Sequence, residues 1–273
     1  MSPRALDDQE ESIQLTRPRA GGTILAAVPL AFLLSSAARA ETRLDLRFPF
    51  SYFSGDFGTG IDTHIISLPS ILVVNHEKHE FHLTVPYVSV TSSGPVTFLG
   101  DQVIARGTGG GATESGPGDV VLQDEYFFVE GGRARPWVSA LFRVKLPTAD
   151  ESRGLGTGEP DAGAGLGFIQ PLGKWWHLLG QTQYVVRGDP PGEDLRNTLW
   201  LSIGLQRRLS GSTSANLTYE RRQSVLPGRP DLADLSLGCD HSFARKLSLR
   251  AAAYLGLSET AEDYGISAGI SLH

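Results

Sequence analysis

Histidines are the residues of this 273-residue chain whose types and spacing come closest to a metal site. His76, His79 and His82 lie in one short segment with Glu80 between the last two. On an extended strand, His76, Glu80 and His82 would share one face, as a weak metal site requires. The segment is not the helical zinc motif, because Glu80 stands where its second histidine belongs. A polar rim beside a turn is the competing interpretation, and we expect neither a metal nor another cofactor.

A serine activated by histidine is the second chemistry to consider, because lipid-modifying membrane enzymes use it. They place a serine two residues after a histidine, so that both lie on one strand face and the imidazole can take the hydroxyl proton. None of the seven histidines is followed in this way. Ser242 follows His241 directly and therefore points to the opposite face, and Thr84 stands two residues after His82. We therefore expect that the chain is not an enzyme.

The glycine-rich segment 163–167 superficially resembles a nucleotide-binding loop. Phe168 follows it where the third glycine should come, and no strand–helix–strand unit surrounds it. Small residues on one strand face are the simpler interpretation. The formal net charge of −6 argues against a nucleic-acid partner. The single cysteine, Cys239, excludes an intramolecular disulfide and a cysteine metal cluster.

The elements that carry these side chains are strands, because apolar residues recur at every second position. In 247–257 the odd positions are Leu, Leu, Ala, Ala, Leu and Leu, and segments 199–207 and 264–272 repeat the alternation. Period two indicates a strand with one apolar and one mostly polar face. The pattern predicts about twelve strands, near 43–53, 61–74, 78–92, 118–130, 134–146, 159–171, 175–187, 195–209, 212–225, 232–243, 246–257 and 262–272.

A leader precedes these strands. Arg17 and Arg19 stand before an apolar run at 24–34, which is too short to span a bilayer, and Ala38-Arg39-Ala40 is a suitable signal-peptidase site. We expect residues 1–40 to form a leader with a removed signal peptide. The mature domain is then 41–273.

An exported chain made of alternating strands predicts an all-β fold, a transmembrane antiparallel β-barrel of up-and-down topology. Tight connections alternate with long ones, as in outer-membrane barrels with short periplasmic turns and longer outer loops. The competing fold is a soluble β-sandwich, whose inner faces also alternate. Strand lengths near the 9–11 residues of membrane strands favour the barrel, and we expect strand 262–272 to close it against 43–53.

The polar strand faces carry charges that could pair inside a lumen. We predict that these residues line it: Arg143, Lys145, Asp161, Arg187, Glu220, Arg222, Asp240 and Arg250. On the other faces, we expect Leu201, Ile203, Leu249 and Leu255 to contact lipid. Trp137, Trp175 and Trp176 follow tight turns, which predicts a place for them in an interfacial aromatic belt.

Three motifs resemble one family of outer-membrane proteins. They are a Gly-Asp strand opening at 118–126, the Lys-Leu-Pro-Thr strand end at 145–148, and the Leu-Gly-Thr-Gly-Glu-Pro-Asp loop at 155–161; Val85-Pro-Tyr-Val88 fits an earlier strand. The chain resembles the family named "Putative MetA-pathway of phenol degradation". Ala149 departs from the family pattern, which has glycine there. The resemblance implies an outer-membrane barrel that passes hydrophobic or aromatic compounds.

Two loops are candidates for control of the pore. Gly154, Gly156, Thr157, Gly158 and Glu159 form a loop that either lines the pore mouth or only satisfies loop geometry. The longest connection, 93–117, either folds into the lumen as a plug or stays outside.

Three functions remain open at this stage. The leading hypothesis is a monomeric outer-membrane channel of a Gram-negative bacterium for passive passage of small, hydrophobic or aromatic molecules. Its expected partners are outer-membrane lipid, the barrel assembly machinery and small hydrophobic solutes. The second is a structural or adhesive barrel with a closed lumen, and the third is a lipid-modifying barrel enzyme.

Overall fold

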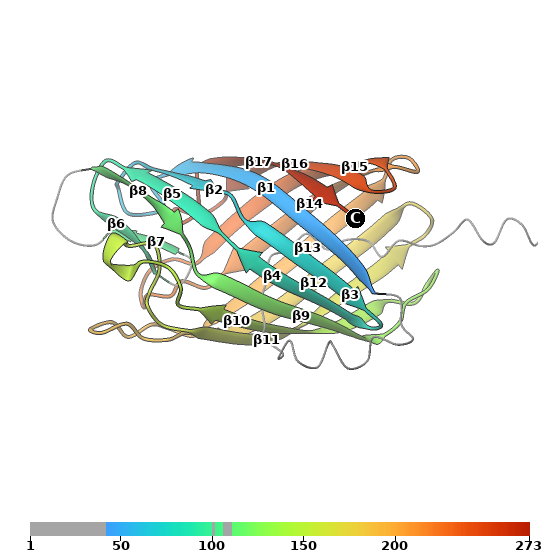
Figure 1. Ribbon diagram of the computed structural model, residues 1–273, viewed down its shortest axis with the longest axis horizontal. Helices are drawn as coiled ribbons and strands as arrows, with labels where there is room; N and C mark the ends of the chain where they lie inside the picture. Colours follow the sequence, from blue (N-terminus) through green and yellow to red (C-terminus); the bar gives the residue numbers. More distant parts are fainter. Residues whose placement is uncertain (1–41, 100–101, 106–110) are drawn as a thin grey trace, which may run out of the picture.

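The chain folds into one closed antiparallel barrel of 12 wall strands in the computed structural model (Figure 1), which describes residues 42–99, 102–105 and 111–273. The predicted all-β barrel is therefore confirmed. The predicted leader lies outside the described residues. In the described part of the chain, no helix is long and apolar enough to cross a membrane.

Nine wall strands are single β-strands, and three are each broken into two. The single strands are β1 (Arg43–Gly55), β10 (Trp137–Leu146), β11 (Asp161–Leu172), β12 (Trp176–Val186), β13 (Thr198–Arg208), β14 (Thr213–Arg222), β15 (Leu232–Ala244), β16 (Leu247–Gly256) and β17 (Tyr264–Leu272). The broken ones are β2 (Thr63–Ser67) with β3 (Ser70–His76), β4 (His79–Val85) with β5 (Tyr87–Ser92), and β8 (Ala112–Pro117) with β9 (Val120–Val129). A separate hairpin, β6 (Val96–Leu99) and β7 (Gln102–Ala105), and the short 3-10 helix η3 (Glu151–Arg153) lie in two loops.

Prolines explain why the predicted strands 61–74 and 78–92 are interrupted. The strand registers place Pro49 opposite Pro69, and Pro69 opposite Pro86, in three adjacent wall strands. Leu68 and Tyr87 exchange both hydrogen bonds, at 2.8 and 3.2 Å, so the carbonyl of Pro69 points toward β1. The opposed Pro49 has no N–H to offer it. The ladder between β1 and β2–β3 therefore lacks two bonds at this level.

The third break is a bulge at the Gly-Asp motif. Asp119 and Val120 together oppose Val85, because the register shifts by one residue between β8 and β9. Gly118 N–H donates to the carbonyl of Pro86 at 2.9 Å, and the Thr148 hydroxyl donates to the carbonyl of Gly118 at 3.2 Å. The hydroxyl thus replaces the donor that Pro86 lacks.

The alternation places apolar side chains outward and polar ones inward. On β13, Leu201 and Ile203 are exposed on the outer wall, whereas Trp200 and Ser202 face the lumen. Leu249 and Leu255 on β16 also face outward, 39% and 54% exposed. Most wall strands of the described chain expose large apolar side chains on the outer wall. Such a surface favours a membrane location over the soluble alternative.

The first and last strands meet, as expected, and His273 fastens the seam. β1 pairs with β17 from Leu46 opposite Leu272 to Ser54 opposite Tyr264, and Figure 1 shows these blue and red strands side by side. The His273 ring contacts Asp45 of β1 at 2.8 Å and Ser248 of β16 at 2.9 Å. The ring therefore ties both neighbours of β17 together inside the barrel.

One predicted belt residue lies inside the barrel instead. Trp137 is 9% exposed and packs with Phe127 and Ile169 in a core cluster of the lumen. Its position on β10 has the same parity as the inward Arg143, so the expectation for Trp137 was wrong. Trp175 and Trp176 are exposed at the short-turn end of the barrel. Lys174 lies over the Trp175 ring and Arg207 over the Trp176 ring.

A candidate solute pathway through the lumen

The barrel encloses a cavity of about 510 Å³, a volume within the range of small-molecule sites. The end of the barrel that carries the long connections is here termed the loop end. Apolar side chains gather in the cavity toward this end, among them Phe53, Ile65, Val88 and Phe98. The opposite wall, on β10 and β13–β16, is polar and charged. The cavity therefore offers an apolar side and a polar side to one occupant.

The β6–β7 hairpin lies at the loop end of the barrel (Figure 1). There its residues Phe98, Gln102 and Val103 line the cavity and roof it. On one side Val103 packs with Phe57 and Ile65, and on another Ile104 packs with Leu195 and Val225. The described part of segment 93–117 thus folds over the lumen as a plug, and it also supplies wall strand β8. The alternative of an external loop was wrong for these residues.

Polar bonds reinforce the same two sides of the hairpin. The Gln102 amide donates to the carbonyl of Gln223 at 2.8 Å and accepts from Val225 N–H at 3.1 Å. The Arg229 guanidinium donates to the carbonyls of Val103 and Phe57. The hairpin is therefore fixed to the loops that follow β14 and β1.

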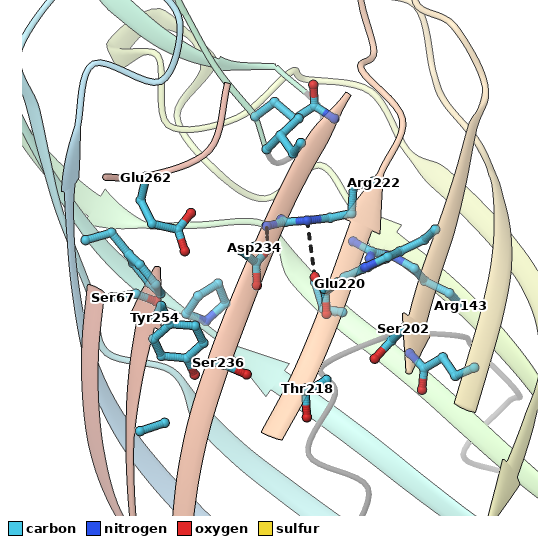
Figure 2. A pocket seen from close by; sticks show the side chains of 18 of the residues that line it. Ser67, Arg143, Ser202, Thr218, Glu220, Arg222, Asp234, Ser236, Tyr254 and Glu262 are labelled. Carbon is cyan, nitrogen blue, oxygen red and sulfur yellow. Dashed lines mark hydrogen bonds and ion pairs between the residues drawn. The ribbon is translucent and has the colours of Figure 1, made fainter. Parts of the chain in front are cut away.

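An acidic and basic cluster lies on the lumen wall formed by β10 and β13–β15 (Figure 2). Arg222 reaches Glu220 at 3.2 Å on its own strand and Asp234 at 3.5 Å on β15. Arg143 and Arg222 lie over the Trp200 ring, with guanidinium carbons 5.8 and 5.5 Å from its centroid. These side chains hold one another in place and form the polar side of the cavity.

Glu262, in the connection between β16 and β17, faces this cluster (Figure 2). Its side chain is buried and lines the cavity. Burial, together with the negative charge of Asp234, raises the pKa of the Glu262 carboxyl above its usual value. The folded barrel therefore holds this proton more tightly than the unfolded chain does.

We expect Glu262→Gln to stabilise the barrel at about pH 8 and to change nothing near pH 4. Because the pKa of Glu262 is raised in the folded state, its proton stabilises the barrel fully below the unfolded pKa of about 4.5. This stabilisation is lost as the pH rises through the folded pKa. Glutamine stays neutral, so the variant does not lose stability in this way. Urea unfolding followed by gel mobility at both pH values measures it, with Glu259→Gln in the same connection as the control. An equal effect of Glu262→Gln at both pH values would contradict the assignment.

A second, more deeply buried ion network lies beneath the loop 147–160. Lys145 Nζ is 3.0 Å from Asp119 and 3.4 Å from Asp161, and it donates to the Thr157 hydroxyl at 2.8 Å. Arg187 Nη1 reaches the same Asp161 carboxylate at 3.0 Å. The side chains of Lys145, Asp161 and Arg187 are 6%, 0% and 3% exposed. All three sequence motifs thus converge on Lys145.

Loop geometry brings the glycine-rich segment onto this network. Asp150 caps η3, and its hydrogen bond from the Ser152 hydroxyl lowers the pKa of the Asp150 carboxyl. Gly154 ends η3 with a φ of 69°. Gly156 has no room for a side chain, because a Cβ there would lie 2.7 Å from the Cβ of Ala149 and 3.0 Å from both oxygens of Asp119. The loop therefore needs these glycines for its fold.

The structure places the predicted site residues in different surroundings. The following line the cavity: Arg143, Lys145, Glu220, Arg222, Arg250, Gly156 and Thr157. Asp161 and Arg187 lie packed in the buried network, and Asp240 pairs with Arg250 at 2.5 Å. Gly154, Gly158 and Glu159 are loop residues outside the lining of this cavity.

Sequence reasoning did not select several residues of the pathway, namely Asp119, Trp200, Asp234 and Glu262. The sequence contained a feature that could have identified two of them. Asp119 belongs to the Gly-Asp motif, and Asp234 has the same strand parity as Asp240. Glu262 lies in a connection, where alternation carries no information.

The histidines do not gather into one site. His76 pairs directly with His79 across a two-residue turn, so His76 lies on the face opposite to Glu80 and His82. The expected shared face of His76 and Glu80 was therefore wrong. His82 contacts Glu80 at 2.9 Å inside the barrel, whereas His79 contacts Asp124 at 3.0 Å on the outer wall. In the described ranges, no group of three or more His, Cys, Asp or Glu side chains could hold a metal.

A closed antiparallel sheet with an apolar outer wall and an ion-paired interior defines a barrel of the outer-membrane type. The structure is similar to the translocator domain of the autotransporter NalP from Neisseria meningitidis, with TM-score 0.53 and 13% identity over 89% of this chain and 91% of that one. The transport unit of the autotransporter AIDA-I from Escherichia coli gives TM-score 0.52 and 11% identity over 89% and 93%. The CymD monoaromatic hydrocarbon channel gives TM-score 0.47 and 11% identity over 92% and 93%.

The chain belongs to the family "Putative MetA-pathway of phenol degradation", whose model matches residues 70–273. This match includes the three motifs that meet at Lys145. Among curated protein sequences, none matches the chain significantly.

Proposed function

We propose that this protein is a passive outer-membrane channel for small molecules with an aromatic or other apolar body and one polar group. The observation that carries the proposal is the two-sided cavity of about 510 Å³. An aromatic ring would lie against Phe53, Ile65 and Phe98. A hydroxyl or carboxylate would reach the polar side at Arg222 or Tyr254.

Other parts of the molecule agree with passage rather than catalysis. Glu220 and Asp234 are held by Arg222, and His82, one of the histidines inside the barrel, is engaged by Glu80. Passive conduction requires a site that binds weakly enough to release its solute.

We further propose that residues 1–40 are removed on export, that the mature chain inserts as a monomer, and that its loop end faces outward.

Efflux from liposomes tests the channel function. We expect benzenesulfonate, whose charge prevents its crossing pure lipid, to leave liposomes containing the protein at least about tenfold faster than it leaves empty ones. Arabinose, a polar solute of similar size, should leave more slowly than benzenesulfonate. Ser202→Trp, inside the lumen, should reduce the benzenesulfonate rate. Leu201→Trp, the adjacent residue on the outer wall, should not.

A structural barrel is the second candidate, because the β6–β7 hairpin seals much of the loop end. For a structural barrel, liposomes containing the protein would release neither solute, and a planar bilayer would show no conductance. That result would overturn the channel function. Release of fatty acid from phospholipid vesicles by the purified barrel would instead show an enzyme.

A further inference from the structure

A second cavity of about 600 Å³ lies at the loop end, between β6, the wall strands β5 and β8, and the loop that carries η3. The Glu114 carboxylate and the Arg153 guanidinium pair at 2.8 Å on its wall, both 44% exposed. Apolar side chains also line it, among them Val90, Val96 and Phe98. This vestibule therefore offers both polar and apolar contacts to a solute.

The vestibule and the lumen cavity share one thin layer of residues. Phe98, Val103, Leu155, Gly156 and Thr157 line both cavities. The larger side chains of this layer, Phe98 and Val103 from the hairpin and Leu155 from the loop, are apolar. We call these three residues the septum. A solute moving between the two cavities by the shortest path crosses the septum.

The hairpin makes fewer hydrogen bonds on this side. Toward the loops after β1 and β14, it packs in two apolar clusters and takes part in three side-chain bonds through Gln102 and Arg229. Toward the loop that carries Leu155, Phe98 N–H and the Thr97 hydroxyl both donate to the carbonyl of Gly154, at 3.0 and 3.2 Å.

The loop side of the septum is rigidly supported from below. Thr157, two residues after Leu155, accepts from Lys145, which the carboxylates of Asp119 and Asp161 hold. Gly156 packs directly on Asp119. The buried ion network thus positions Leu155 as the loop-side edge of the septum, facing Phe98 of the hairpin.

From this arrangement we propose that the septum is the selectivity element of the pathway, through which flat apolar solutes pass from the vestibule to the lumen cavity. The inference rests on the proposed channel function and adds the route and its discriminating residues. Phe98 and Leu155 give a solute apolar contact on both faces. A strongly hydrated solute would have to lose water there without new hydrogen bonds, which is costly.

Efflux of naphthalenesulfonate relative to benzenesulfonate tests the septum, because the two solutes differ by one fused ring. Leu155→Ala and Phe98→Ala should each raise this ratio several-fold and Leu155→Trp should slow both solutes by about tenfold. Leu195→Ala, in the apolar cluster on the other side of the hairpin, is the matched control and should leave the ratio unchanged. Gel mobility without heating shows that each variant has folded.

The outcomes separate the two proposals. If the wild-type protein releases neither sulfonate, the channel function itself fails. If it releases them but the Leu155 and Phe98 variants keep the wild-type ratio, or Leu195→Ala changes it equally, only the septum is overturned. Should an alanine variant not fold, Leu155→Cys in a Cys239→Ser background replaces it. A bulky thiol reagent must then block efflux there and not at Leu195→Cys.

Discussion

Replacing Asp161 with alanine is expected to destabilise the barrel by about 3–5 kcal/mol, because it leaves buried cations without their partner. The Asp161 carboxylate is fully buried and contacts Arg187 at 3.0 Å and Lys145 at 3.4 Å. It also accepts from Gly188 N–H at 3.2 Å. Lys145 retains its ion pair with Asp119 in the variant. Most of the lost stability therefore comes from Arg187, which loses its carboxylate partner. Urea titration of the barrel in detergent, followed by gel mobility without heating, measures the effect.

Asp240→Ala is the control for this variant. Asp240 also pairs with an arginine, at 2.5 Å, but the two side chains are 27% and 35% exposed within the lumen. Solvent screens such a pair, so its loss should cost no more than about 1 kcal/mol. Similar losses in the two variants would contradict the role of burial. An unchanged Asp161→Ala barrel would show that the network does not hold the loop.

Ile203→Arg is expected to impair folding into bilayers by about 2–4 kcal/mol, the cost of a cation on the lipid face near the bilayer midplane. Ile203 lies in the middle of β13 and is 51% exposed on the outer wall. Its neighbours across the ladder are Gly180 and Tyr219, neither of which carries a compensating charge. Folding yield into lipid vesicles, read from heat-modifiable migration, provides the measurement.

Ser202→Arg, one residue away, is the matched control. Ser202 faces the lumen and lies directly opposite Glu220 (Figure 2), which can pair with an introduced guanidinium. Its folding yield should therefore stay near that of the wild type. Equal losses at positions 202 and 203 would mean that the assigned faces, and with them the membrane orientation of the wall, are incorrect.

Much of the wall could be predicted from the sequence, because alternation is a local property. A side chain's face on a strand follows from its parity, so the outward positions of Ile203 and Leu255 required no tertiary information. Parity also places Trp137 inside with Arg143. The belt assignment failed because it used the distance from a turn in place of the parity. The strand count was predictable for the same reason, since each wall strand ends at a recognisable turn.

Contacts between distant segments were decided only by the tertiary structure. Pro49, Pro69 and Pro86 align because two strand registers happen to place them in one row, and a register depends on both partners of a pair. His76 left the face of Glu80 because the turn between β3 and β4 has two residues. The hairpin roof depends on side chains from three other loops, those of Phe57, Leu195 and Arg229. Lys145 meets Asp119 and Asp161 because β10 pairs with β9 on one side and β11 on the other, in registers that bring three strand ends together. Such registers depend on both partners of each pair, which alternation does not express.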